Sequence, residues 1–193
     1  MPTTASIQII AFDSSSGWEA WLEENHASLD GVWLRIFKKN SGQPTVSYAE
    51  ALDGALCYGW IDGQRNSHDA QSYLQKFTPR RPQSVWSKIN TGHIERLVKM
   101  GRMKPSGLAA VAASQRDGRW QAAYDSPSKA VIPKDFLEEL SENKKAKAFF
   151  ATLNKANLYS IAWRLQTAKK PETRERRMEA IPEMLAKGKR FHG

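Results

Sequence analysis

Short strand-like runs and helical stripes of apolar residues alternate along the first part of the chain. The β-branched segments 7–12 and 32–37 predict two strands, and apolar residues spaced three and four apart predict helices at 16–26 and 48–58. Two more strands are expected in "GWIDGQR", which would enter a tight Asp-Gly turn, and in "SYLQKFTPRR". The alternation predicts a small antiparallel sheet with helices packed against it.

Capping signatures mark where two of these helices should begin. Ser16 with Glu19, and Ser47 with Glu50, have the spacing of a capping box, in which each side chain hydrogen-bonds a backbone N–H of the first turn. Gly59 suits the left-handed residue that often follows a helix. Further along the chain, the pattern predicts a helix at 85–100 and a shorter one at 108–115.

From Pro133 onward the pattern is helical throughout. The expected helices lie near residues 133–141, 143–151, 154–168 and 171–187. The predicted fold class is therefore α+β, with a small antiparallel sheet and helices followed by an all-helical C-terminal segment. The expected domains are an α+β domain over residues 1–118, a connector over 119–132 and the helical segment over 133–193.

The net charge of +9 lies in the C-terminal part of the chain. Residues 1–142 hold 16 Lys and Arg against 16 Asp and Glu, whereas residues 143–193 hold 13 against 4. Such a basic segment favours an anionic partner, which would be nucleic acid, a phosphate ligand or acidic lipid. The alternative is a solvated helical face that keeps the protein soluble.

Part of this positive charge is balanced within one helix, because Glu172 and Arg176 lie four residues apart. The remaining basic residues concentrate at predicted helix ends and are candidates for contacts with nucleic-acid phosphates. They are Lys144, Lys145, Lys147, Lys169, Lys170, Arg174, Lys187, Lys189 and Arg190. We expect a binding surface if these helix ends converge in space and a soluble helical cap if they do not.

The candidate ligand site lies between Gly59 and Met103, where aromatic and polar residues are interleaved. An anion would bind between arginines at a strand end and the free N–H groups of a helix start near Ser84. The candidate residues are Trp60, Asp62, Arg65, Arg80, Arg81, Ser84, Trp86 and Lys88. The alternative is that these arginines pair with nearby carboxylates.

Motifs for catalysis, metal binding or export are not found in the sequence. The four histidines are scattered without metal-ligand spacing, the runs GxSxG, Walker A and GxGxxG are lacking, and Cys57 is best interpreted as a small buried hydrophobe. We therefore expect no metal, no cofactor and no identifiable catalytic residue. A single cysteine and the lack of a signal peptide or membrane-spanning run predict a cytoplasmic protein, whose oligomeric state stays open.

Five segments in order resemble a known family. "SYAEALDGALCYGWIDGQR", "YLQKFTPRRPQSVWSKIN", "GRMKPSGLAAV", "KAFFATL" and "QTAKKPETRERR" are similar to the YdeI/OmpD-associated family, also described as bacteriocin-protection proteins. The resemblance extends from about Trp18 to Phe191 and implies an α+β part followed by a small helical part. It also implies a role in tolerance to bacteriocins or antimicrobial peptides, and some members are described as periplasmic, but it transfers no catalytic residues.

The leading hypothesis is a non-enzymatic, ligand-binding protein of this family, linked to stress or peptide tolerance. A protective role would be indirect, since a basic surface repels cationic bacteriocins. One alternative is a nucleic-acid-binding protein that uses the basic C-terminal helices. The other is an enzyme of unknown reaction centred on Asp62, with Arg65 and Trp60, although no second group that would tune this carboxylate is identifiable.

Overall fold

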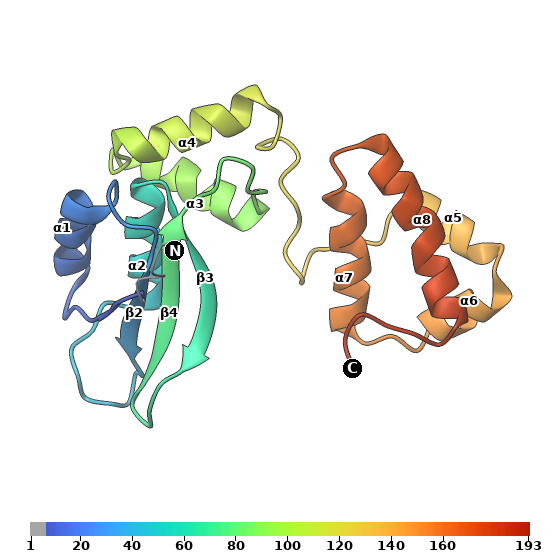
Figure 1. Ribbon diagram of the computed structural model, residues 1–193, viewed down its shortest axis with the longest axis horizontal. Helices are drawn as coiled ribbons and strands as arrows, with labels where there is room; N and C mark the ends of the chain where they lie inside the picture. Colours follow the sequence, from blue (N-terminus) through green and yellow to red (C-terminus); the bar gives the residue numbers. More distant parts are fainter. Residues whose placement is uncertain (1–6) are drawn as a thin grey trace, which may run out of the picture. The chain divides into compact units, whose positions relative to one another are not determined.

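The computed structural model describes residues 7–193, so the first six residues of the expected domain 1–118 lie outside the described range. Within the described residues the chain forms one four-stranded sheet and eight helices (Figure 1). The predicted α+β class is therefore confirmed. By their contacts the residues divide into two compact units. The first unit holds residues up to Ser84 together with Gly92–Gly118, and the second holds Val85–Thr91 and Arg119–Gly193.

The sheet belongs to the first unit and is mixed rather than purely antiparallel. Its strands, in spatial order, are β1 (Ile9–Ile10), β2 (Val32–Phe37), β4 (Ser72–Pro79) and β3 (Trp60–Ser67). β1 and β2 run parallel, and the other pairs run antiparallel. The expectation of an antiparallel sheet was wrong for the first pair because helix α1 (Ser15–Asn25) lies between β1 and β2 and brings the chain back in the same direction.

The hairpin of β3 and β4 turns later than the sequence predicts. β3 continues through Asp62 and Gly63 to Ser67, so the expected Asp-Gly turn is wrong and the chain turns at residues 68–71. A bulge interrupts the register between Asp62 and Arg65. The buried side chain of Gln75 donates hydrogen bonds to the carbonyl oxygens of Gly63 and Gln64 there, which satisfies backbone groups that the bulge removes from the ladder.

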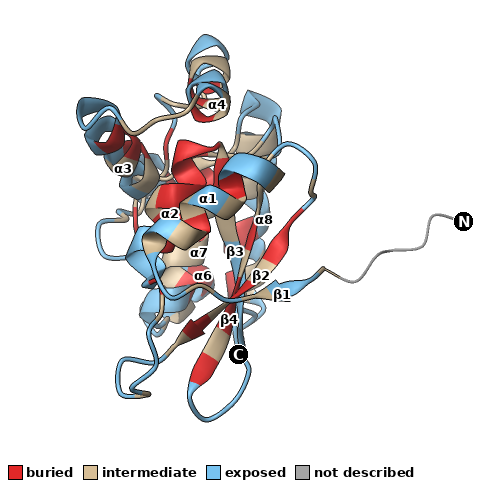
Figure 2. Ribbon diagram, turned by 90° about the vertical axis from the view of Figure 1, so that its left-hand side faces the viewer, coloured by how far each residue is buried: buried red, intermediate tan, exposed pale blue. Residues whose placement is uncertain are grey.

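Helices cover one face of this sheet. Figure 2 shows α1 and α2 (Tyr48–Cys57) in front of the strands, and the core of the unit lies between these layers. The ring of Trp18, which is fully buried, lies 5.5 Å from the ring of Phe77 on β4, and its Nε1 donates to the carbonyl oxygen of Ala51. The helix faces predicted from apolar spacing therefore form the interior of the first unit.

The helix starts follow the predicted capping in one case and not in the other. Ser47 and Glu50 form the expected capping box, and Gly59 has the expected positive φ of 79°. The box predicted for Ser16 and Glu19 was wrong, because the N-cap of α1 is Ser14, two residues before Ser16. Several serines in a row offer competing cap positions, and the helix uses the first of them.

Two more helices follow the sheet. Helix α3 spans Lys88–Lys99 and helix α4 spans Pro105–Arg116. α3 starts later than the expected residue 85 because Ser87 pairs with Tyr124 in an isolated parallel bridge. The amide of Lys88 donates to the carbonyl oxygen of Tyr124, and the amide of Tyr124 donates to that of Trp86, so these backbone groups are used outside a helix.

The second unit contains the four helices that the sequence predicts after Pro133. They are α5 (Lys134–Ser141), α6 (Lys144–Phe150), α7 (Lys155–Gln166) and α8 (Pro171–Ala186), each within two residues of the expected bounds. Their buried apolar residues form one core cluster, made of Phe136, Leu140, Ala146, Ile161, Leu165, Ile181 and Leu185. Among the described residues, no helix is long and apolar enough to cross a membrane.

Candidate functional site

The two tryptophans of the predicted ligand site are interior residues. The side chain of Trp60 is 1% exposed, and its Nε1 donates a 3.0 Å hydrogen bond to the carbonyl oxygen of His26. Trp86 is 2% exposed and lies in the second unit, where its ring is 5.1 Å from that of Trp120. Neither ring presents a free face on which a ligand could stack.

The predicted arginines lie at different levels of the sheet. The amide of Arg80 donates to the carbonyl oxygen of Gly59, which places Arg80 and Arg81 beside the start of β3. Arg65 instead lies opposite Gln75, five residues back along β4. At about 3.3 Å per residue the two backbones are roughly 16 Å apart, and side chains that stand perpendicular to a sheet do not meet over that distance.

Ser84 and Lys88 also differ from the expected arrangement. The amide of Ser84 donates to the carbonyl oxygen of Arg81 in a turn, and the helix starts only at Lys88. The Nζ of Lys88 lies 2.8 Å from a carboxylate oxygen of Asp125, in the second unit. The hydrogen bond and charge of Lys88, with a hydrogen bond from Gln166, outweigh desolvation and keep the pKa of Asp125 below its usual range. The charge of Lys88 is therefore already compensated.

Of the predicted residues, Arg65 alone lines a cavity at the turn of the β3–β4 hairpin. This cavity, the hairpin pocket, has a volume of about 250 Å³. It is lined by Lys38, Arg65, Asn66, Ser67, Ser72 and Tyr73. The guanidinium carbon of Arg65 lies 3.8 Å from the centroid of the Tyr73 ring, close enough for a cation–π contact.

Within the described residues, the positive charges of the hairpin pocket are held by neutral groups. The Nζ of Lys38 donates to the carbonyl oxygens of Asp69 and Ala70, at 3.3 and 2.9 Å, which are neutral acceptors. In the part of the chain that the structure describes, no carboxylate forms an ion pair with Lys38 or Arg65. Two cations on neutral supports make this cavity attractive to an anion.

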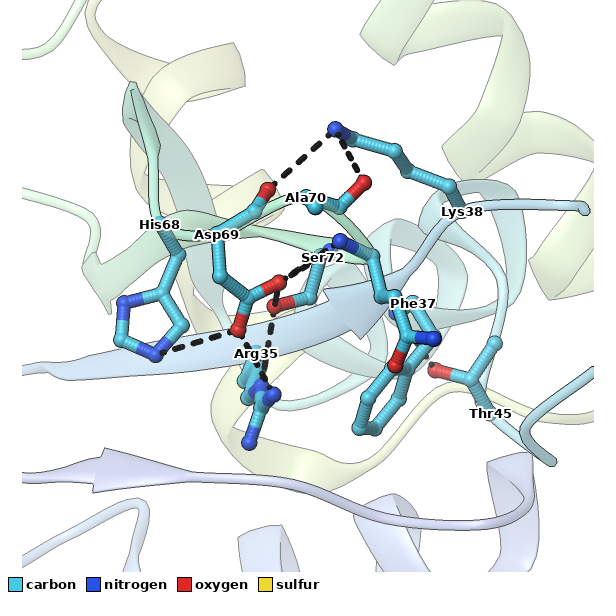
Figure 3. Close-up of polar contacts among 9 residues, drawn as sticks. Arg35, Phe37, Lys38, Thr45, His68, Asp69, Ala70 and Ser72 are labelled. Carbon is cyan, nitrogen blue, oxygen red and sulfur yellow. Dashed lines mark hydrogen bonds and ion pairs between the residues drawn. The ribbon is translucent and has the colours of Figure 1, made fainter. Parts of the chain in front are cut away.

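The carboxylate of Asp69 holds the turn beside the pocket (Figure 3). Its Oδ1 accepts hydrogen bonds from the amides of Gln71 and Ser72 and from the Ser72 hydroxyl, at 2.7 to 2.8 Å. Its Oδ2 lies 2.8 Å from a guanidinium nitrogen of Arg35. The hydrogen bond from Ser72, the two amides and the charge of Arg35 outweigh desolvation and keep the pKa of Asp69 below its usual range. This carboxylate is thus committed to the turn and leaves the cations of the pocket available.

Asp62, the centre of the enzyme hypothesis, faces a tyrosine. The hydroxyl of Tyr48 donates a 2.9 Å hydrogen bond to Oδ2 of Asp62. Burial and the negative charge of Asp62 raise the pKa of Tyr48 well above its usual range, so the phenol keeps its proton at neutral pH.

In the described residues, no group of three or more His, Cys, Asp or Glu side chains could hold a metal ion.

The basic residues of the C-terminal helices lie at separate places. Lys169 and Lys170 precede α8, and Lys187 follows it, as do Lys189 and Arg190. With 16 residues, α8 separates the two groups by about 24 Å. The exposed Lys144, Lys145 and Lys147 lie on α6, which contacts α8 and lies near its C-terminal end (Figure 1).

Arg174, on α8, is engaged in a different way. Its guanidinium forms a 2.6 Å ion pair with Asp135 on α5. The nine candidates for nucleic-acid contact therefore fall into groups at the two ends of α8 and one ion pair between helices, rather than along one continuous line.

The sequence reasoning missed Lys38 and Tyr73 as site residues. Lys38 directly follows the predicted strand 32–37, and Tyr73 lies in the segment where aromatic and polar residues are interleaved. Both residues reach the pocket because β2 pairs with β4 in a register that places Ile36 opposite Tyr73. This register exists only in the folded sheet. The sequence does contain a signal for the role of Asp69. An aspartate in a polar segment often accepts a hydrogen bond from the backbone amide two residues further on, which forms an Asx turn.

The fold and the pocket define a two-unit α+β protein with a basic cavity at a hairpin turn. A family model described as a domain of unknown function (DUF8412) matches residues 10–110, just over half of the chain. The chain therefore belongs to the family that this domain defines. A second model, described as "Bacteriocin-protection, YdeI or OmpD-Associated", matches residues 129–188. The resemblance to that family is thus confirmed for the helical part of the chain.

The extent of this resemblance differs from the expected one. The segments quoted from Ser47 to Val111 fall in or beside the region of the first model, so the YdeI/OmpD-associated match is confined to the second unit. Comparisons with curated proteins and with solved structures gave no match.

Proposed function

We propose that the protein is a non-enzymatic binding protein whose hairpin pocket takes a small anion with phosphate or carboxylate groups. The observation that supports this most directly is the pairing of Lys38 and Arg65 in one cavity without a carboxylate partner in the described part of the chain. Two like charges that line one cavity raise its positive potential, and an anion bound between them would offset their repulsion.

The remaining pocket residues fit an anion with several oxygens. The planar guanidinium of Arg65 can donate two parallel hydrogen bonds. Its contact with Tyr73 already restricts the side chain, so little conformational freedom is lost when an anion binds. Asn66 and Ser67 add an amide and a hydroxyl that can donate to further oxygens. The pocket volume of about 250 Å³ suits a phosphate with a small substituent.

A titration with inorganic phosphate tests this proposal. We expect saturable chemical-shift changes in the amides of residues 65–73, and a rise in thermal stability that sodium chloride at equal ionic strength does not produce. At a phosphate concentration 100 times the Kd, linkage predicts a stabilisation of about 2.7 kcal/mol. The double variant Lys38→Gln, Arg65→Gln should lose both effects.

The matched control is the double variant Lys39→Gln, Arg81→Gln, which removes the same charge at exposed positions outside the pocket. If this control loses phosphate binding to the same degree as the pocket variant, the response reflects net charge and the proposal is wrong. Equal binding by the pocket variant and the unchanged protein would also refute it.

For the biological role, we propose an indirect contribution to tolerance of bacteriocins, antimicrobial peptides or related stress, exerted in the cytoplasm. The match to a family described as bacteriocin-protection supports the tolerance role, and the +9 net charge argues against direct capture of cationic peptides. Deletion of the gene should increase sensitivity to such peptides. The unchanged gene should restore tolerance, and the Lys38→Gln, Arg65→Gln gene should not. Equal tolerance with and without the gene would rule this role out.

Binding of nucleic acid through the second unit is the alternative. The excess of 13 Lys and Arg over 4 Asp and Glu in residues 143–193 supports it, although α8 separates its basic ends by about 24 Å. A mobility-shift titration over several salt concentrations tests it, since each phosphate contact steepens the salt dependence. Lack of binding at low salt would exclude this alternative. If the double variant Lys187→Gln, Lys189→Gln binds as well as the unchanged protein, the C-terminal end of α8 is not the binding surface.

A further inference from the structure

Helix α7 carries large apolar side chains on two opposite faces. Ile161 and Leu165 are buried in the core cluster of the second unit. Tyr159 and Trp163 lie four residues apart, on a face turned about 160° away from Ile161 at 100° per residue. A helix that needs one apolar face to pack therefore presents a second, aromatic one.

This aromatic face lines a cavity, which we call the α7 pocket. The cavity has a volume of about 310 Å³ and is lined by Ala156, Tyr159, Ser160, Trp163, Arg164 and His192. The ring of Trp163 also makes an edge contact with Tyr124, with centroids 6.2 Å apart and an interplanar angle of 81°. That contact restrains the indole at the side of the cavity.

The C-terminal residues close one side of the α7 pocket, and a buried asparagine holds them there. Asn157 is 1% exposed, and its Oδ1 accepts hydrogen bonds from the amides of Phe191 and His192, both at 3.0 Å. Its Nδ2 donates to the carbonyl oxygen of His192 at 3.3 Å. Nε2 of His192 then lies 2.7 Å from the hydroxyl of Ser160. A fully buried amide thus fixes the position of an exposed imidazole at the cavity.

Arg164 supplies a positive charge to the same cavity. Its guanidinium carbon lies 4.2 Å from the centroid of the Phe191 ring, and its Nε is a buried donor without an acceptor in the described residues. In the described part of the chain, no carboxylate forms an ion pair with the guanidinium of Arg164. Because Arg164 lines the cavity, an anionic group bound there would supply the counter-charge that its guanidinium lacks in the described residues.

We infer that the α7 pocket is a second binding site, for a small planar aromatic molecule that carries a phosphate or carboxylate group. The ligand ring would stack against Trp163 and Tyr159, and its anionic group would pair with Arg164. Ser160 and His192 would hydrogen-bond its polar edge. This inference is independent of the proposed function, which concerns the hairpin pocket of the first unit.

AMP serves as the probe, with adenosine and ribose 5-phosphate as its uncharged and non-aromatic counterparts. We expect AMP to shift the indole N–H signal of Trp163, which the Trp163→Leu variant identifies by its loss. Because both the ring and the charge contribute, adenosine and ribose 5-phosphate should each bind at least about tenfold more weakly than AMP, a difference of about 1.4 kcal/mol. Arg164→Gln should reduce AMP binding to the level of adenosine.

Two further variants distinguish the α7 pocket from the hairpin pocket and from a general loss of fold. His192→Ala changes an exposed side chain, so the fold should persist while AMP binding weakens several-fold. Lys38→Gln, Arg65→Gln should leave the Trp163 response unchanged, since those residues line the hairpin pocket. The inference is overturned if AMP leaves the Trp163 signal unmoved, if Arg164→Gln binds AMP as well as the unchanged protein does, or if the hairpin variant abolishes the response.

Discussion

Two helical glycines have opposite surroundings. A Cβ atom on Gly107, in α4, would lie 2.2 Å from the carbonyl oxygen of Cys57 and 2.8 Å from its carbonyl carbon. A Cβ atom on Gly92, in α3, would meet no atom within 4 Å. Glycine is therefore needed at residue 107 for the close approach of two backbones, whereas at residue 92 it only lowers the helix propensity.

Exchange of each glycine for alanine tests this difference. Gly107→Ala should lower the free energy of unfolding by about 2–4 kcal/mol because rigid backbone must move, and Gly92→Ala should raise it by about 0.5–1 kcal/mol. Urea titrations of the two variants beside the unchanged protein measure both values. Equal effects of the two substitutions would contradict the close approach of α4 to the end of α2.

The single cysteine is a buried apolar residue, as the sequence predicts. Cys57 is 3% exposed, and burial is the main reason why its pKa rises to about 11. At pH 8 the thiolate fraction is then on the order of one in a thousand, against roughly a quarter for an ordinary thiol with a pKa near 8.5. We expect the folded protein to react with iodoacetamide at least about 100-fold more slowly than the protein in guanidinium chloride. Comparable rates would show that Cys57 is accessible.

At the scale of elements, the β3–β4 hairpin depends on one carboxylate. Asp69 accepts hydrogen bonds from two amides and a hydroxyl of the turn, and it pairs with Arg35 on β2. The same turn provides the carbonyl oxygens that hold Lys38 over the hairpin pocket. The shape of the pocket therefore follows from the turn, and the turn follows from Asp69.

This arrangement predicts a pH dependence. Because the folded pKa of Asp69 is depressed, its stabilising effect is present above the unfolded pKa of about 3.9 and is lost as the pH falls through the folded pKa. Asp69→Asn should therefore lower the Tm at pH 7, and the Tm difference from the unchanged protein should shrink below about pH 4. The control Asp30→Asn, at a position outside the hairpin, should leave the Tm unchanged at both pH values. A Tm difference for Asp69→Asn that is constant with pH would contradict the role of its charge.

At the scale of the whole molecule, each unit has an interior of its own. The first is centred on residues such as Trp18 and Phe77, and the second on the cluster that contains Phe136 and Leu185. Separate cores open as separate cooperative units when few stabilising contacts are shared. The two family matches, one for residues 10–110 and one for 129–188, follow the same division closely.

Core truncation in one unit should therefore leave the other protected. Phe136→Ala should cost about 3–5 kcal/mol, and hydrogen exchange should accelerate in α5 to α8 while β2 and β4 keep their protection. Leu34→Ala, in the core of the first unit, should give the reverse pattern at a cost of about 2–5 kcal/mol. Uniform acceleration throughout the chain in either variant would show that the two units unfold together.

Local chemistry was sufficient to predict most elements. The helices from α5 to α8 lie within two residues of their predicted bounds, and Ser47 and Glu50 cap α2 as expected. Helical periodicity, caps and glycine stops act over only a few residues, so the sequence alone contains them. The same holds for the burial of Cys57 beside Leu56, because one face of α2 is apolar.

Properties that depend on strand pairing were decided only by the tertiary structure. The chain turns at residues 68–71 rather than at the expected Asp62–Gly63 because this gives a longer ladder. The ladder begins where Trp60 pairs with Pro79 and ends where Ser67 pairs with Tyr73. The parallel direction of β1 follows from the crossover through α1. Neither the register nor the direction of pairing is encoded in a short window of sequence.

The two pockets show the same limit. The sequence by itself determined that the chain is an α+β protein with a basic helical end, because charge and periodicity can be counted along it. It grouped Arg65 with Arg80, which lies at a different level of the sheet, and with Trp86, which belongs to the other unit. Only folding brought Lys38 to Arg65 and His192 to Trp163, because the residues of each pair are far apart in sequence. The first pair meets through the register of the sheet, and the second through the buried amide of Asn157.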